Sequence, residues 1–228
     1  MDETEPDESD VFSQEFWDQR YAGSERVWSG RPNQRLVELA AGLTPGTALD
    51  VGCGEGADVV WLAQQGWRVT GADISVVALE RAEAHAAEAG VADRTSWVHA
   101  DLVGGAALPG DQDLVTAMFV HVPEAEFDRV YTAIGAAVRP GGHLLVAAHH
   151  PDERDTDLRN PQLGHLLFGP ERVTRVLRSG WTIDVAEART RAVGGAHGHG
   201  HGHGQDHGHG HGSAVATDTV VLARREPA

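Results

Sequence analysis

Short apolar runs alternate with helix-like stretches along most of this chain. Seven runs have the length and composition of buried strands: 47–51, 67–71, 95–100, 113–119, 143–148, 181–189 and 215–224. Amphipathic or Ala-rich stretches typical of helices lie among them, at 34–41, 55–65, 76–89, 123–138 and 170–179. Strands that alternate with helices favour a mostly parallel sheet covered by helices. The pattern therefore predicts an α/β fold in a single domain.

The two ends of the alternating pattern set the expected domain limits. Residues 1–11 are nearly free of apolar side chains, and six of the first ten residues are acidic, which predicts a disordered acidic tail. We expect the folded domain over 12–228. A His/Gly-rich stretch at 194–213 interrupts it, and we interpret this stretch as a flexible loop between the last two strands.

A glycine-rich turn after the first predicted strand carries the clearest chemical signal. Asp50 ends an apolar run, and Gly52, Gly54 and Gly56 follow at every second position before a helix begins. Glycine lets a ligand approach bare backbone, and a helix N-terminus favours a nucleotide-like ligand. Asp73 follows the second strand, 21 residues after Gly52. An acid at that spacing suits the two hydroxyls of a ribose.

The same turn also allows a different reading. Gly52, Gly54 and Ala57 fit the dinucleotide pattern G-x-G-x-x-G/A, which would indicate an NAD-dependent oxidoreductase. Asp50 argues against this, because a carboxylate at the mouth of the strand would repel a diphosphate but suits a cationic ligand. Gly56 adds a third glycine in the alternating register, which the dinucleotide pattern does not need.

The whole pattern, D-x-G-x-G-x-G followed by an acid after the next strand, resembles the cofactor motif of class I S-adenosylmethionine (SAM)-dependent methyltransferases. The resemblance covers roughly residues 12–225 and is strongest over 48–73. Within that family the chain is similar to the small-molecule branch of tellurite-resistance and thiopurine enzymes. The resemblance implies SAM as cofactor and a Rossmann-like, mostly parallel seven-stranded sheet in the order 3-2-1-4-5-7-6, with an antiparallel last strand.

The resemblance also assigns cofactor contacts to the glycine turn and to the ends of neighbouring strands: Asp50, Gly52, Gly54, Gly56, Asp73, Ile74, Asp101, Leu102 and Phe119. Asp73 is expected to accept both ribose hydroxyls. Asp101 is expected to receive the adenine amino group, with Leu102 beside the ring. One such acid could be a helix cap or a solvated turn residue. Three acids at three successive strand ends favour a binding site.

The loop after the fourth strand borders the transferred methyl group in the resembled fold. His121 in this loop could be a general base or a substrate contact, or it could simply pack on the cofactor. His149 and His150 end the fifth strand on the same rim. Together with His121 they could bind a metal or polarise a nucleophile.

An aromatic segment, 12–31, precedes the first strand and includes Tyr21 and Trp28. It could be a helix packed on the domain or a lid that faces the cofactor's sulfonium, since cations favour aromatic faces. Tyr21 and His121 are therefore the candidate catalytic residues for an oxygen or nitrogen acceptor. A thiol or a metalloid oxyanion is the other acceptor class that we predict, and it would need no base.

Half of the fourteen histidines lie in the low-complexity stretch, mostly alternating with glycine: His197, His199, His201, His203, His207, His209 and His211. Imidazoles on flexible backbone suit Zn, Ni or Cu, so weak metal binding is one interpretation and a solvated loop insertion is the other. The metal interpretation supports an alternative function, a metal-sequestering protein on a methyltransferase-like scaffold.

Composition narrows the partners. The formal net charge is −16 and the chain contains no lysine, which argues against nucleic-acid or anionic-membrane partners. The single cysteine, Cys53, permits no internal disulfide and fits a reducing cytoplasm; within the glycine turn it reads as a small residue rather than a nucleophile. We expect a cytoplasmic protein whose partner is a small-molecule substrate. The sequence leaves the oligomeric state open.

Overall fold

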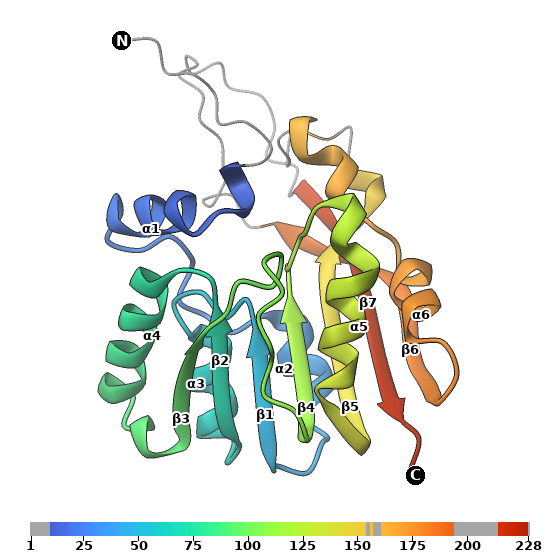
Figure 1. Ribbon diagram of the computed structural model, residues 1–228, viewed down its shortest axis with the longest axis horizontal. Helices are drawn as coiled ribbons and strands as arrows, with labels where there is room; N and C mark the ends of the chain where they lie inside the picture. The colour runs from blue at the N-terminus through green and yellow to red at the C-terminus, as the bar shows by residue number, and fades with distance from the viewer. Residues whose placement is uncertain (1–9, 154–155, 157–160, 194–213, 228) are drawn as a thin grey trace.

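Seven strands form one sheet in the order β3-β2-β1-β4-β5-β7-β6 in the computed structural model (Figure 1), which describes residues 10–153, 156, 161–193 and 214–227. The strands are β1 (Thr47–Val51), β2 (Arg68–Asp73), β3 (Thr95–His99), β4 (Gln112–Met118), β5 (Val138–His149), β6 (Trp181–Val193) and β7 (Ala214–Arg225). The first five pair in parallel, and β7 runs antiparallel to both β5 and β6. The predicted strand order and fold class are confirmed.

Helices cover both faces of the sheet. They are α2 (Gln34–Ala40), α3 (Ala57–Gln64), α4 (Val76–Glu88), α5 (Phe127–Ala136) and α6 (Pro170–Leu177), whereas α1 (Gln14–Ala22) lies at one end of the sheet. Short 3₁₀ helices lie at Asp10–Phe12, Ala92–Arg94, Glu124–Glu126, Pro151–Glu153 and Pro161–Leu166. Asp10 and Val11 belong to the first of these, and residues 1–9 of the predicted tail lie outside the described part, so the tail stays a prediction.

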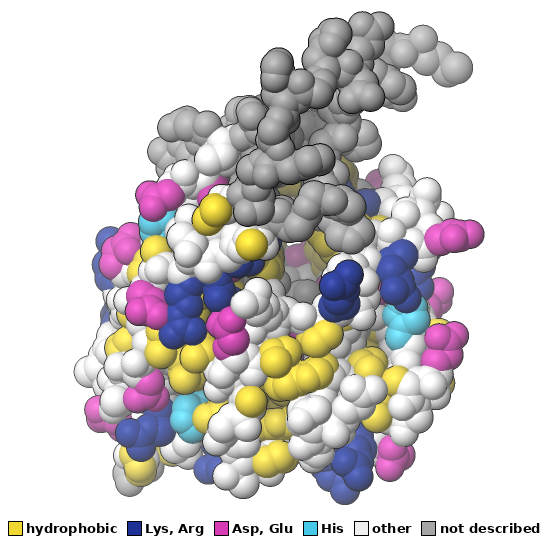
Figure 2. All heavy atoms as spheres, turned by 180° about the vertical axis from the view of Figure 1, so that it is seen from behind, with side chains coloured by type: hydrophobic (Ala, Val, Ile, Leu, Met, Phe, Trp, Pro, Cys, Tyr) yellow, Lys and Arg dark blue, Asp and Glu magenta, His cyan; other side chains and the backbone are white. Residues whose placement is uncertain are grey.

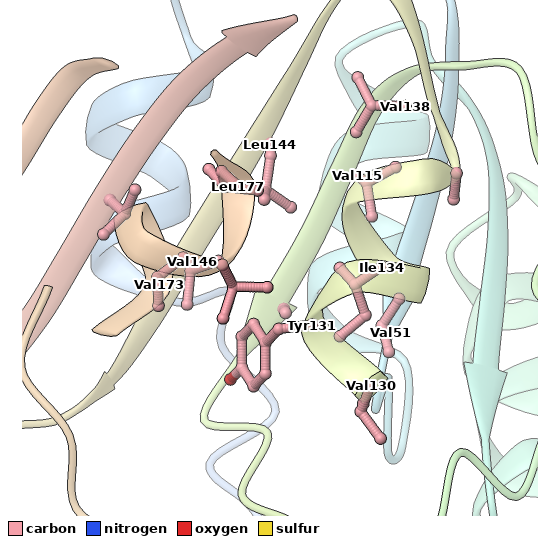
Figure 3. Close-up of a cluster of buried hydrophobic side chains, with 14 of the residues drawn as sticks. Val51, Val115, Val130, Tyr131, Ile134, Val138, Leu144, Val146, Val173 and Leu177 are labelled. Atoms are coloured by element: carbon pink, nitrogen blue, oxygen red, sulfur yellow. The ribbon is translucent and has the colours of Figure 1, made fainter. Parts of the chain in front are cut away.

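Two apolar cores fill the space between the sheet and the helices on its two faces. One core packs α5 and α6 against the sheet, and Figure 3 shows Tyr131, Ile134 and Leu177 pointing from these helices toward Val115 and Val146 on the strands. The other core joins α2, α3 and α4 to the opposite face. Burial on both faces explains why the strands read as near-continuous apolar runs.

Local capping chemistry sets where three helices begin. The hydroxyl of Ser13 accepts from the N–H of Phe16 at 3.2 Å, and that of Ser75 accepts from Ala78 at 3.1 Å. Asn33 likewise begins α2, as its side-chain oxygen lies 2.8 Å from the N–H of Arg35. Each cap satisfies an N–H that has no partner within its helix, so these starts could be predicted from sequence.

Other boundaries differ from the prediction. The helix expected at 123–138 begins only at Phe127, because Pro123 is extended and residues 124–126 form a 3₁₀ turn. The strand expected at 143–148 begins at Val138, which pairs with Gln112 ahead of a register shift. Strand β6 runs four residues beyond its predicted end at 189, and β7 one residue beyond each predicted end, because the two strands pair with each other as far as Val193 and Ala214.

Figure 2 views the molecule from behind and shows acidic and basic side chains interspersed over that face. The net charge of −16 is therefore not gathered there into a patch of one sign. Within the described residues, every helix is too short or too polar to cross a membrane. The His/Gly-rich stretch at 194–213, with its seven candidate metal ligands, lies outside the described part of the chain.

Candidate functional site

The predicted site residues meet at the edge where the parallel strands end. In Figure 1, α1 lies across this end of the sheet. The backbone N–H groups of Gly52 and Cys53 both donate to the carbonyl of Ala72 at the end of β2, at 2.8 and 3.1 Å. Ala100 donates to the carbonyl of Asp73 at 2.8 Å, which brings the end of β3 to the same edge. The turn after β1 is thus fixed to the neighbouring strand end.

All three glycines of the turn have positive φ, at 69° for Gly52, 52° for Gly54 and 80° for Gly56. Side chains other than glycine rarely adopt this conformation, so the alternating glycines are required by the backbone. Their surroundings differ. Gly52 is exposed, whereas Gly54 and Gly56 are buried.

The two buried glycines are covered by different elements. A Cβ at Gly54 would lie 2.9 Å from the hydroxyl of Tyr21 and 3.2 Å from the indole nitrogen of Trp28. A Cβ at Gly56 would lie 2.8 Å from Ala82 on α4. Gly56 therefore allows close packing of α3 on α4, which is a structural role that the sequence did not separate from ligand contact.

Three carboxyl groups lie close together beneath the turn. Asp50 is buried and accepts from the Thr116 hydroxyl at 2.6 Å, and burial together with nearby Asp58 raises its pKa well above its usual range. Burial also raises the pKa of Asp73, and it raises the pKa of Asp58 to about 6. Crowded, desolvated acids favour a nearby positive charge, which would lower the cost of ionising them.

Asp73 supports the turn as well as facing the edge. Its Oδ2 accepts from the N–H of Gly54 at 2.8 Å, and its Oδ1 accepts from the N–H of Ser75 at 2.9 Å. The neighbouring Ile74 is half-buried, and its carbonyl lies 2.9 Å from Nε2 of His99. A carboxylate has about four lone-pair sites, so two backbone donors leave acceptor capacity for a diol.

Asp101 is exposed after β3, and its Oδ1 accepts from the N–H of Gly104 at 2.7 Å. Asp101 therefore caps a turn, which agrees with the alternative interpretation of this acid as a turn residue. Its side chain also lies at the exposed rim where the predicted adenine contact would be. Leu102 beside it is half-buried against the α5–α6 core.

The N-terminal aromatic segment is held over the glycine turn by two acids. Asp18 on α1 accepts from the hydroxyl of Ser75 at 2.6 Å. Glu55, inside the turn, accepts from the N–H groups of Val27 and Trp28, both at 3.1 Å, and pairs with Arg81 at 3.0 Å. Sequence reasoning missed both acids, because Asp18 meets a serine 57 positions away and the backbone N–H partners of Glu55 carry no residue signature.

Tyr21 lies inside this arrangement and is buried. Its hydroxyl accepts from the Trp28 indole N–H at 2.8 Å. Burial, with a further contribution from the charge of Asp73, raises the pKa of the Tyr21 phenol above its usual value. The phenol stays protonated at neutral pH, so its chemistry is that of a hydrogen-bond donor and not of a base.

The loop after β4 closes the other side of the turn. Phe119 has φ of 58°, an uncommon conformation for a residue other than glycine, and its carbonyl lies 3.0 Å from Nδ1 of His121. Such strain is retained where the surrounding structure holds the residue firmly. A Cβ at Gly52 would lie 2.8 Å from Cγ2 of Val120, so this loop touches the exposed glycine. Tyr131 fixes the loop by donating to the Val120 carbonyl at 2.8 Å.

Two histidine rings stack beside this loop. The centroids of His121 and His149 are 5.3 Å apart with an interplanar angle of 17°, and Phe119 lies 4.4 Å from His149. His149 Nδ1 lies 3.6 Å from Oε2 of Glu153, whose side chain is almost fully buried. The structure therefore brings together two histidines that the sequence places 28 residues apart.

Comparison with known proteins agrees with this geometry. Residues 48–142 match a family model described as a methyltransferase domain. The ubiquinone biosynthesis O-methyltransferase of Cupriavidus pinatubonensis is 37% identical over 113 residues, 49% of this chain and 44% of the relative. A 2-heptyl-1-hydroxyquinolin-4(1H)-one methyltransferase of Mycobacteroides abscessus is 28% identical over 172 residues, 73% of this chain and 74% of the relative. The chain spans about half the length of the first curated relatives it matches.

Solved structures share the fold. The magnesium protoporphyrin IX methyltransferase of Synechocystis PCC 6803 has a TM-score of 0.62 at 19% identity, covering 96% of this chain and 100% of that one. TehB from Haemophilus influenzae has a TM-score of 0.66 at 14% identity, covering 93% and 67%. Over residues 48–142 the chain carries a methyltransferase domain, and its fold is that of class I SAM-dependent methyltransferases. The resemblance based on residues 48–73 is confirmed, and the narrower tellurite-resistance and thiopurine branch stays a prediction.

The methyltransferase domain accounts for the placement of the sequence-predicted residues. The candidate cofactor contacts lie along one edge of the sheet or in the turn above it. Of the candidate catalytic residues, Tyr21 covers Gly54, and His121 follows Val120, which touches Gly52. The roles assigned to them stay predictions. Within the described residues, no group of three or more His, Cys, Asp or Glu side chains is arranged to hold a metal ion, so the interpretation of His121, His149 and His150 as a metal site has no support.

Proposed function

We propose that this chain transfers the methyl group of SAM to an oxygen atom of a small-molecule acceptor. The observation that carries the proposal is the continuous edge formed by the glycine turn, Asp73 and Asp101, with two stacked histidines on its far side. That edge offers cofactor contacts on one side and acid–base groups on the other. The family match over 48–142 supports the same assignment.

The residues present fit SAM as a cofactor. Gly52 offers exposed backbone in a conformation where a side chain would collide with Val120. Asp73 and Asp101 supply carboxylates at successive strand ends for the ribose and the adenine amino group. The crowded carboxyls Asp50 and Asp58 favour a cation above them, which suits the sulfonium and ammonium groups.

SAM supplies an electrophilic methyl group when it is bound. The chain's own contribution is to align the acceptor and to keep water out. The aromatic segment at 12–31 suits the second task, because Tyr21 and Trp28 already cover Gly54 and are fastened through Glu55. We therefore propose that this segment is a lid as well as a packed helix.

The acceptor side favours an oxygen nucleophile. A hydroxyl must lose its proton as it attacks, and His121 and His149 on the rim are the groups that can take one near neutral pH. The relatives' names refer to O-methylation in one case and to a hydroxyquinolinone in the other. A thiol or metalloid oxyanion would need no base, so an acceptor of that class is the competing proposal.

Isothermal titration with S-adenosylhomocysteine tests the cofactor assignment. Asp73→Asn keeps the shape but loses an acceptor oxygen and its charge, so we expect affinity to fall about 10- to 100-fold. Asp93→Asn, on an exposed turn, is the matched control and should bind normally. Absence of binding by the parent protein would reject the proposal, and unchanged affinity in Asp73→Asn would reject the assigned role. A panel of phenols, thiols and metalloid oxyanions with labelled SAM then identifies the acceptor class.

A further inference from the structure

We propose that Glu153 and His149 form a proton-accepting pair, in which His149 takes the acceptor's proton and Glu153 positions and charges the imidazole. The inference rests on the proposed O-methyltransferase function. It assigns the base to the end of β5 and adds a carboxylate that no sequence motif indicated. His149 is the residue that would touch the acceptor, and Glu153 acts through it.

Glu153 is held in place with little freedom. Its side chain is 2% exposed, and Oε1 accepts from the backbone N–H of Thr217 on β7 at 2.5 Å. The other oxygen, Oε2, faces Nδ1 of His149 at 3.6 Å. A buried carboxylate at this distance favours the charged form of the His149 imidazole over the neutral ring. The distance shortens to a hydrogen bond with a movement of well under an ångström, and catalytic hydrogen bonds often tighten when ligands bind.

Within the part of the chain that the structure describes, two further carboxylates near His149 contact other side chains. Asp152 lies 3.2 Å from Nδ1 of His150. Asp218, the register partner of His149 on β7, is paired with Arg35 and Arg191, each at 3.1 Å. Among the described residues, Glu153 brings a carboxylate to the His149 imidazole from the 3₁₀ turn that follows β5.

The rings beside His149 suit a cation as well. Phe119 lies 4.4 Å from it, and an aromatic face stabilises positive charge. His121 stacks on the His149 ring, and its Nδ1 lies within hydrogen-bond distance of the Phe119 carbonyl. The Phe119 carbonyl offers His121 a dipole, whereas Glu153 offers His149 a full charge. The arrangement therefore favours His149 over His121 as the final holder of the proton.

The proposed step is balanced. The acceptor's O–H bond breaks and its proton moves to Nε2 of His149. The oxygen uses its electron pair to form the new O–CH₃ bond while the CH₃–S bond breaks. The positive charge that enters on the sulfonium ends on the imidazolium, where Glu153 neutralises it. Once the contact tightens and Nδ1 donates to Glu153, Nε2 is the nitrogen that carries the lone pair in the neutral ring.

Glu153→Gln tests this through the histidine's tautomer. The Gln oxygen would still accept from Thr217, which turns the amide NH₂ group toward His149. Nδ1 must then accept and Nε2 must carry the hydrogen, so the ring can no longer take the acceptor's proton. Histidine ¹⁵N NMR with bound S-adenosylhomocysteine should show His149 switching from the Nδ1–H to the Nε2–H form, with its pKa lowered by at least about one unit.

Turnover gives the second readout. With catechol, whose hydroxyl keeps its proton at the assay pH, Glu153→Gln should lower kcat about 100-fold or more with little change in KM. With 4-nitrocatechol, assayed at a pH where it is already ionised, the loss should be several-fold at most. Asp152→Asn removes the exposed carboxylate next in sequence and is the matched control, which should behave as the parent with both acceptors.

The outcomes are distinguishable. If the parent protein neither binds S-adenosylhomocysteine nor transfers methyl groups, the proposed function fails. If it does both but Glu153→Gln keeps the parent's tautomer and turnover, the proposed pair alone is refuted. If Glu153→Gln does not fold, His149→Asn carries the test: equal losses with both catechols would refute a base at this position, and a loss confined to the protonated acceptor would support it.

Discussion

Glu55 should control whether the aromatic segment stays closed over the glycine turn. Its carboxylate is buried, and it accepts from the N–H groups of Val27 and Trp28 and from Arg81. A hydrogen bond to a charged group contributes about 1.5–3 kcal/mol to stability. The hydrogen bond from Arg81 contributes near the lower value, because this side chain is partly exposed to solvent. Glu55→Gln keeps one acceptor oxygen but turns an NH₂ group toward donors. We therefore expect segment docking to lose about 2–4 kcal/mol.

Native-state hydrogen exchange measures this directly. Protection of the Val27 and Trp28 amides should fall about 30- to 1,000-fold in Glu55→Gln, the factor that corresponds to the free energy above. The amide of Ala100, which donates to the Asp73 carbonyl within the sheet edge, should keep its protection and serves as the internal reference. Loss at all three amides would indicate global destabilisation instead of lid release.

A matched substitution separates this effect from loss of any surface ion pair. Glu126 pairs with Arg129 at 2.7 Å, with both side chains more than one-third exposed. Exposed pairs contribute at most about 1 kcal/mol, so Glu126→Gln should leave protection at Val27 and Trp28 unchanged. If Glu55→Gln also leaves it unchanged, the carboxylate does not hold the segment, and the argument from its burial and three donors is wrong.

Two further predictions concern the carboxyl cluster and the histidine tract. Since the pKa of Asp58 is raised to about 6, between about pH 4 and pH 6 the native state holds a proton that the unfolded chain has lost, and the free energy of unfolding falls as pH rises. In Asp58→Asn that fall should shrink by about 1–3 kcal/mol in urea unfolding, and an identical pH profile would contradict the assigned shift. Deleting 196–212 should abolish Ni²⁺ binding measured by titration while leaving S-adenosylhomocysteine affinity intact; loss of both would show that the tract serves the cofactor site.

Features governed by nearby residues could be predicted from the sequence. Ser13, Asn33 and Ser75 begin helices because each caps an N–H within three positions. The glycine turn could be found because its backbone conformation restricts residue choice at fixed spacing. The strand order came from the resemblance, since alternation alone specifies only parallel pairing.

Functional contacts between distant segments could not be found in the same way. Glu55 meets Val27 and Trp28 through their backbone N–H groups, which every residue except proline offers. Glu153 follows His149 by four positions, yet the two lie on a strand end and a 3₁₀ turn, where helical spacing rules do not apply. Such pairs become visible only when β5, β7 and the 3₁₀ turn at Pro151–Glu153 are placed in space.

The long ladder between β6 and β7 makes the sheet insensitive to what connects its last two strands. Val193 and Ala214 are register partners, so the chain leaves the sheet and returns to it at adjacent points. The closure entropy of an intervening segment grows only slowly with its length, about 0.6 kcal/mol for each doubling. Residues between these points can therefore be exchanged, extended or replaced by a reporter without changing strand order. This position is a natural graft site, where a second binding activity can be added beside the edge that carries the glycine turn while the core stays unaltered.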